Sequence, residues 1–242
     1  MRILYPCLAL FLMIAVVSCF NNHRRVNGNG KAGTQTRSVS GVTEISLTAG
    51  IDVELSSGET SVRLEGDENI LPYVETVVKN GELVIRYRRN VRIETDNPVK
   101  VYVSTPTLNS VEISGGGNVT GEDKWSSKQP MRFSISGSGD IYMIVNTPRV
   151  RGNISGSGNL NLAGETKDVE VDISGSGNYR GKGLKAEVAD INIVGSGDAE
   201  TFADVALKAK IVGSGSIRYA GNADVSKNIT GSGSVDKVSQ AE

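Results

Sequence analysis

The chain has 242 residues and a formal net charge of −1 at pH 7, from 26 basic and 27 acidic side chains. No basic stripe interrupts this balance, so nucleic acid is excluded as a partner. The two cysteines, Cys7 and Cys19, lie near the start, so the rest of the chain must be stabilised by core burial without disulfides.

Residues 1–18 are predicted to be a signal peptide. Arg2 supplies a positive start, and residues 8–17 form an apolar run too short to span a bilayer. The sequence VVSC at residues 16–19 resembles the lipobox of bacterial lipoproteins. The resemblance implies cleavage before Cys19 and lipid attachment to that residue, which would anchor the protein to a membrane. The alternative is an ordinary secretory signal with a chance cysteine.

Residues 19–41 are rich in Asn, Gly, Ser, Thr and Arg and contain almost no large apolar side chains. This composition predicts a flexible tether that holds the folded part away from the membrane. Residues 20–25 contain no acid, unlike the residues that follow the lipidated cysteine in surface-exported lipoproteins of some Gram-negative groups. The absence of acid disfavours surface export without excluding it. We expect an exported outer-membrane lipoprotein that faces either the cell surface or the periplasm.

Residues 42–105 alternate apolar and polar side chains, as half-buried strands do. Asn80-Gly81, between two pairs of apolar residues, predicts a β-hairpin. This stretch is interpreted either as a strand-rich cap or as irregular first coils of the domain that follows. We expect it to pack on residues 106–238, because a stacked architecture needs its terminal coil covered.

Residues 106–238 repeat an isoleucine, a small residue and a glycine-rich turn seven times, with 18 to 22 residues between successive isoleucines. A period near 20 is typical of stacked coils. The turn needs glycine because other residues resist positive φ, and because a larger side chain would collide with its copy about 4.8 Å away. We assign a structural role to the turn glycines, which are Gly115, Gly117, Gly137, Gly139, Gly156, Gly158, Gly175, Gly177, Gly195, Gly197, Gly213, Gly215, Gly231 and Gly233.

Period-two alternation precedes the turns, as in Val169, Val171 and Ile173. About 19 residues at roughly 3.3 Å each give a coil perimeter near 60 Å, which accommodates two or three short strands. The sequence therefore predicts an all-β fold, a parallel β-helix or β-solenoid with about seven coil turns. Residues 42–242 are expected to form this single domain, with the repeated isoleucines stacked along its core.

Two blocks resemble the auto-transporter adhesin head domain, also called the GIN domain. One is GIDVEL at residues 50–55 with LVI at residues 83–85, and the other is the ladder of glycine turns. The resemblance covers about residues 39–238. It implies a β-helical fold on an exported protein, with adhesion as a role inferred from fold-level analogy. It brings no catalytic residues.

Histidine-dependent chemistry is not expected, because His23 is the only histidine and lies in the predicted tether. No cofactor or metal is expected either, since the turn acids Asp140 and Asp198 stand too many coils apart to share a calcium ion. The enzymatic alternative is a carboxylate-based polysaccharide lyase or hydrolase. It would use Asp172 and Asp190 on adjacent coils, which otherwise form part of a solvated surface.

Binding is the favoured class of function, because a solenoid offers long flat faces. Trp125, the only tryptophan, lies in the longest segment between repeats and is a candidate ligand contact, with burial of its ring as the alternative. We expect a non-enzymatic adhesion or scaffold protein that binds a glycan or protein through many weak contacts. The alternative is a periplasm-facing binding protein. A solenoid end could also pair with another copy, giving a homo-oligomer.

Overall fold

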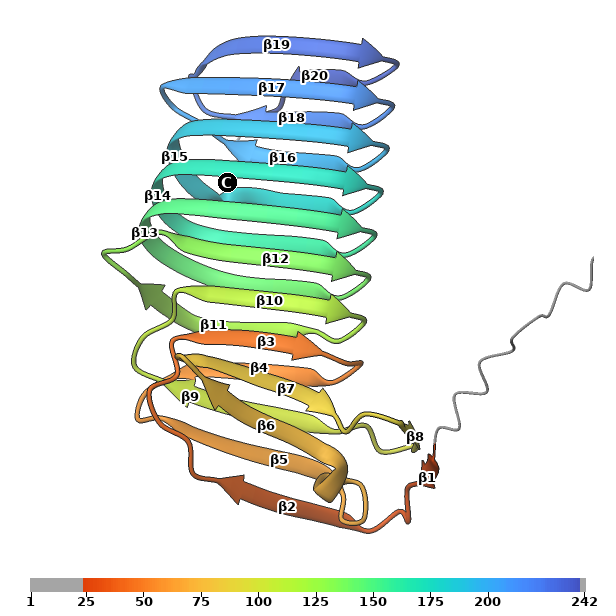
Figure 1. Ribbon diagram of the computed structural model, residues 1–242. Coiled ribbons are helices and arrows are strands. Elements are labelled where there is room, and N and C mark those ends of the chain that lie inside the picture. The colour runs from red at the N-terminus through yellow and green to blue at the C-terminus, as the bar shows by residue number, and fades with distance from the viewer. Residues whose placement is uncertain (1–23, 240–242) are drawn as a thin grey trace, which may run out of the picture.

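The computed structural model describes residues 24–239, which form a column of stacked β-coils (Figure 1). The all-β solenoid predicted from the repeat is confirmed. The strands of the repeats are β10 (Ser110–Gly115), β11 (Val119–Ser126), β12 (Met131–Gly137), β13 (Asp140–Gly156), β14 (Asn159–Gly175), β15 (Asn178–Gly195), β16 (Asp198–Phe202), β17 (Ala206–Gly213), β18 (Ser216–Ala220), β19 (Asp224–Gly231) and β20 (Ser234–Lys237).

The remaining elements precede the repeats. They are β1 (Arg24–Asn27), β2 (Ala32–Arg37), β3 (Glu44–Thr48), β4 (Asp52–Ser57), β5 (Ser61–Asp67), the 3-10 turn η1 (Leu71–Tyr73), β6 (Val74–Lys79), β7 (Glu82–Tyr87), β8 (Val91–Glu94) and β9 (Lys100–Thr105). None of the described residues forms a helix long and apolar enough to cross a membrane.

Each coil places one strand on each of two parallel sheets. The front sheet contains β7, β3, β10, β12, the second halves of β13, β14 and β15, then β17 and β19. The back sheet contains β9, β4, β11, the first halves of β13, β14 and β15, then β16, β18 and β20. The long strands β13, β14 and β15 bend from one sheet into the other, so two sheets enclose one continuous core.

The repeated isoleucines form a ladder inside the front sheet, as expected from the repeat. Each pairs in register with its copy in the next coil. Six of the seven, Ile113 to Ile211, are 0–1 % exposed, whereas Ile229 in the last coil is partly buried. Leu47 in β3 extends the ladder by one position before Ile113, so the ladder consists of Leu47, Ile113, Ile135, Ile154, Ile173, Ile193, Ile211 and Ile229. Burying one such side chain stabilises the fold by roughly 1.5–3 kcal/mol, so the repeat supplies much of the core.

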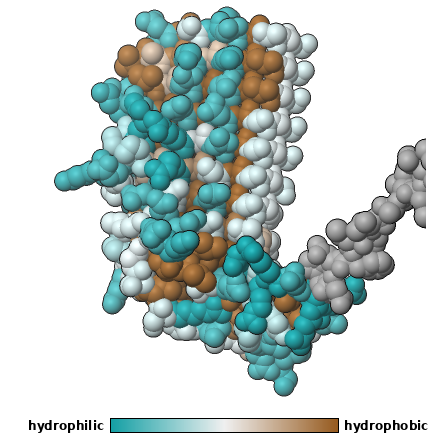
Figure 2. All heavy atoms as spheres, in the orientation of Figure 1, coloured by the Kyte–Doolittle hydropathy of each residue, from teal (hydrophilic) through white to brown (hydrophobic). Residues whose placement is uncertain are grey.

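The glycine turns stack into a pale ridge along one edge of the column (Figure 2). Gly156 has a φ of +122°, and a Cβ atom built there would lie 2.4 Å from the carbonyl oxygen of Gly137 in the preceding coil. A Cβ atom on Gly158 would lie 2.2 Å from the Gly139 carbonyl oxygen. A side chain at these turns would therefore collide with the backbone of the neighbouring turn.

β3 and β4, the first strands of the two parallel sheets in chain order, lie inside the stack, and later strands pair with them on both sides. β3 and β4 pair with β10 and β11 on one side, and with β7 and β9 on the other. β5 then adds antiparallel to β9, β2 antiparallel to β5, and β6 antiparallel to β7 through the predicted Asn80-Gly81 hairpin. Residues 42–105 thus supply both irregular coils and a cap over the N-terminal end.

The prediction of a flexible tether over residues 19–41 is wrong for residues 24–37, which form β1 and β2. β1 pairs with β8, and β2 pairs with β5 along its whole length. Arg37 at the end of β2 donates hydrogen bonds to the carbonyl oxygens of Val74 (2.6 Å) and Leu71 (3.0 Å). The tether was predicted because residues 19–41 contain almost no large apolar side chains, but polar contacts hold residues 24–37 in place instead. The predicted signal peptide and Cys19 lie outside the described residues.

Candidate binding groove

A ladder of polar side chains follows the turns, where each back-sheet strand begins. Its members are Asp52, Asn118, Asp140, Asn159, Asn178, Asp198 and Ser216. The Asp140 carboxylate accepts hydrogen bonds from the backbone N–H (2.9 Å) and side-chain amide (2.6 Å) of Asn159. Asn118 accepts one from the Asp140 backbone N–H at 3.2 Å. These side chains cap the turns, and no cluster suited to a metal ion occurs among residues 24–239.

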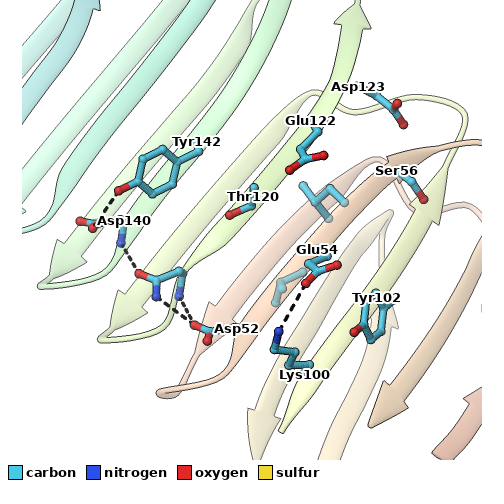
Figure 3. Close-up of a pocket in the computed structure, with 13 residues that line it drawn as sticks. Asp52, Glu54, Ser56, Lys100, Tyr102, Thr120, Glu122, Asp123, Asp140 and Tyr142 are labelled. Carbon is cyan, nitrogen blue, oxygen red and sulfur yellow. Dashed lines mark hydrogen bonds and ion pairs between the residues drawn. The ribbon is translucent and has the colours of Figure 1, made fainter. Parts of the chain in front are cut away.

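A shallow groove of about 580 Å³ crosses the back sheet over β9, β4, β11 and β13. The parallel register places one outward residue from each strand in a row across its floor: Tyr102, Glu54, Thr120 and Tyr142. Tyr142 is 43 % exposed at one end of the row, and Tyr102 lies at the other end, with Glu54 and Thr120 between them (Figure 3). Two aromatic faces therefore bracket a polar floor.

A β-bulge in β11 gives the groove one of its walls. The register with β13 slips between Gly121 and Lys124, so Glu122 and Asp123 leave the ladder and line the groove. The Asp123 carboxylate accepts a hydrogen bond from the backbone N–H of Ser57 at 2.7 Å, which ties the bulge to the end of β4. Bulges commonly re-aim side chains in this way beside binding sites.

Trp125 lies beneath this bulge rather than on the surface. Its side chain is 3 % exposed, and a Cβ atom built on Gly121 would lie 2.9 Å from its indole nitrogen and 2.6 Å from the Met143 sulfur. The interpretation of Trp125 as a ligand contact is therefore wrong, because the ring fills the core where the bulge lifts the backbone. The buried ring packs on the core side of β11, under the strand that forms one wall of the groove.

The groove is acidic. Asp52, Glu54, Glu122, Asp123 and Asp140 line it together with one lysine, Lys100, which gives a formal charge of −4. The Lys100 ammonium lies 3.7 Å from the Glu54 carboxylate. At the Tyr102 end, the Arg63 guanidinium lies 3.9 Å from the ring centroid and covers part of that aromatic surface. Tyr142 is the more exposed of the two tyrosines and offers its face more freely.

Most carboxylates of the groove already have a partner. Asp52 accepts from the Asn118 amide (2.9 Å), while Asp140, Glu54 and Asp123 are held as described above. Among residues 24–239, the Glu122 carboxylate has no hydrogen bond or ion pair with another side chain. Glycoside hydrolysis needs two available carboxylates at a fixed separation, so this arrangement suits binding better than catalysis.

The outward acids predicted as an enzymatic pair, Asp172 and Asp190, do lie on adjacent coils of one face, but diagonally, two residues out of register. The register sets Asp190 opposite Glu170 and Lys208, and Asp172 opposite Asn153 and Asn192. Asp190 forms an ion pair with Lys208 at 3.0 Å, while Asp172 accepts from the Asn192 amide at 3.0 Å. Each acid thus interacts with a neighbour in its own column.

Residues 27–223 match the model of the family described as "Putative auto-transporter adhesin, head GIN domain". The match includes all of β2 but only the last residue of β1, Asn27. No curated protein is significantly similar to the chain.

Several solved structures resemble the chain. A putative adhesin from Bacteroides fragilis has a TM-score of 0.84 at 21 % identity, over 88 % of this chain and 100 % of that one. A putative adhesin from Parabacteroides merdae has a TM-score of 0.70 at 26 % identity, over 89 % and 99 %. A putative lipid binding protein from Parabacteroides distasonis has a TM-score of 0.65 at 27 % identity, over 89 % and 100 %.

Proposed function

Because the chain belongs to the family of putative auto-transporter adhesin head GIN domains, we propose that it is a non-catalytic adhesion protein of the cell envelope. Its ligand is a glycan, held in the acidic groove of the back sheet. The observation that carries this proposal is the row Tyr102, Glu54, Thr120 and Tyr142, in which two tyrosines bracket polar side chains on four adjacent strands. The resemblance to a putative adhesin at 26 % identity supports the class of function.

The groove has the chemistry that sugars need. Aromatic faces pack against the apolar faces of sugar rings, while carboxylates accept hydrogen bonds from sugar hydroxyls. Tyr102 and Tyr142 are three strand spacings apart, or about 14 Å, which suits a short oligosaccharide better than a single sugar. The floor between them lies on paired strands, so binding orders little backbone and the site is preorganised.

The lipobox-like sequence that ends at Cys19 supports a lipid anchor. This residue lies five positions before Arg24, where β1 begins beside the N-terminal cap (Figure 1). A lipid on Cys19 would hold the capped end near the membrane and direct the C-terminal coils away from it. Many anchored copies on one membrane would raise the avidity of individually weak contacts.

The location is tested by protease accessibility on intact cells, with Cys19→Ala as the control for anchoring. Cleavage of the protein on unbroken cells is the result expected of an adhesin. Protection until the outer membrane is opened would contradict a role in adhesion and would favour a binding protein that faces the periplasm.

The groove is tested by glycan-array binding of the purified chain. Tyr142→Ala removes the exposed stacking face and should weaken binding about tenfold, the equivalent of roughly 1.4 kcal/mol. Glu54→Gln should weaken it in the same direction. Glu170→Gln is the matched control, because Glu170 is an exposed carboxylate on the front sheet. Equal losses for Glu54→Gln and Glu170→Gln, or unchanged binding by Tyr142→Ala, would contradict this assignment of the groove.

A further inference from the structure

The two ends of the column are built differently. At the N-terminal end, β5, β2 and β6 run antiparallel to their neighbours and cover the coil formed by β7 and β9. At the other end, β19 pairs with β17 and β20 pairs with β18, each along one side only. Within residues 24–239 no strand pairs with their outer sides. Such a free edge is normally a template for another chain.

The side chains of this last coil depart from the pattern of the coils beneath it. One inward column of the front sheet is buried from coil to coil and contains Val111, Phe133, Gly152, Val171, Ile191 and Ala209. Its next member, opposite Ala209, is Lys227, which is exposed. This row of paired residues therefore changes from apolar to cationic in β19, the strand that has no partner on its outer side.

The back sheet also ends on a lysine. Buried Thr201 pairs with half-buried Tyr219, and Tyr219 pairs with exposed Lys237 in β20. Val225, Ile229 and Val235 flank the two lysines and are half-buried against the core. The terminal coil therefore presents apolar side chains and unpaired backbone groups, with one ammonium on each sheet among them.

We propose that Lys227 and Lys237 are blocking residues that prevent a second copy from stacking on the C-terminal end. Stacking would continue both sheets and bury Val225, Ile229 and Val235, which are the usual driving forces for association. It would also place two ammonium groups of each copy in the core of the new interface. An ammonium buried without a partner is strongly disfavoured, and inward-pointing charge is a known means of protecting sheet edges.

This arrangement predicts which self-association the protein avoids. Two copies joined end to end by a two-fold axis would set β19 against its own copy, with both sets of lysines in one interface. Like charges would then add to the desolvation of each ammonium. The free edges of β19 and β20 should therefore not pair with those of a second copy of this chain.

The experiment compares the mass of the full chain and its variants in a nonionic detergent by sedimentation. Replacing both lysines by apolar strand formers, Lys227→Ile with Lys237→Val, should convert a monomer to a dimer and tighten self-association by about tenfold or more. The matched control, Lys210→Ile with Lys167→Val, removes two exposed lysines away from the inward columns of the last coil and should remain monomeric.

A second variant, Lys227→Thr with Lys237→Thr, guards against misfolding because threonine keeps strand propensity and polarity. It should associate in the same direction, though less tightly. Native fluorescence of buried Trp125 reports that each variant is folded. The proposal is overturned if the folded variants stay monomeric at the concentrations used for the wild type. It is equally overturned if the wild type already dimerises through its C-terminal coil, as a Ser232→Cys cross-link would reveal.

Discussion

Replacing Gly158 by alanine should be among the most damaging single-methyl additions to this protein. The new Cβ atom would lie 2.2 Å from the Gly139 carbonyl oxygen and 2.6 Å from the Ile135 Cγ2 atom, whereas ordinary contacts begin at 3.4 Å. Relief requires the two coils to separate by about 1 Å at this turn. The turn's hydrogen bonds, from the backbone N–H groups of Ser157 (2.8 Å) and Gly158 (3.1 Å) to the Gly137 carbonyl oxygen, would then weaken.

The magnitude follows from these two losses. Overpacking of this kind costs about 1–3 kcal/mol, and weakening of a backbone hydrogen bond adds about 1 kcal/mol. We therefore expect Gly158→Ala to lower the free energy of unfolding by about 3 kcal/mol. Because each coil contacts only its neighbours, the damage should be concentrated in the coils on either side of the turn.

Urea denaturation followed by Trp125 fluorescence measures this effect, since Trp125 is the only tryptophan and is 3 % exposed. Two controls separate the collision from other causes. Gly183→Ala makes the same substitution where the new Cβ atom meets Ala163 at an ordinary 3.4 Å. Ser157→Ala changes an exposed residue of the same turn. If Gly158→Ala stays within about 1 kcal/mol of both controls, the steric argument for the glycine ladder is refuted.

Three further predictions follow from the polar ladder, a buried phenol and the open end. Asn159→Asp replaces an amide donor to Asp140 (2.6 Å) by a second carboxylate and should destabilise the fold by about 1–3 kcal/mol in urea; a loss that persists below about pH 4 would contradict a charge effect. Burial raises the pKa of Tyr87 to about 12 from an ordinary 10, so its neutral form favours the folded state, and stability should fall as pH rises from 10 to 12. Tyr87→Phe should make that decline shallower in alkaline denaturation, and an unchanged slope would be contrary evidence. Amide hydrogen exchange should be faster in β19 and β20, which are paired on one side only, than in β17 and β18, which are paired on both sides, and equal protection of the four strands would count against an open end.

The repeat could be read from the sequence because each of its features is local. An isoleucine, a small residue and a glycine turn recur within a few positions, and stacking copies in register fixes both the inward ladder and the steric demand on glycine. The same reasoning missed β2, whose sequence AGTQTR has no apolar alternation and no fully buried residue. Antiparallel pairing with β5 and the hydrogen bonds of Arg37 hold it in place, and such contacts leave no periodic signal.

The groove could not be predicted because chain order and spatial order differ there. Tyr102, Glu54, Thr120 and Tyr142 are neighbours only because β9 pairs with β4, and β4 in turn pairs with β11. The bulge that re-aims Glu122 and Asp123 is also invisible to a period-two pattern. The sequence drew attention to Trp125 in this segment, but its side chain supports the site from the core.

The position of the groove follows from the logic of a repeat protein. Regular coils place similar side chains at similar positions, so their faces change little from one coil to the next. A unique site requires a break in the repeat, and residues 24–239 provide one where the first coils of β3, β4, β7 and β9 meet the bulge of β11. A bound glycan should therefore protect backbone amides of β4, β11 and β13 from hydrogen exchange and leave β17 and β19 unaffected. Protection spread evenly along the back sheet would instead indicate that the repeat itself is the binding surface.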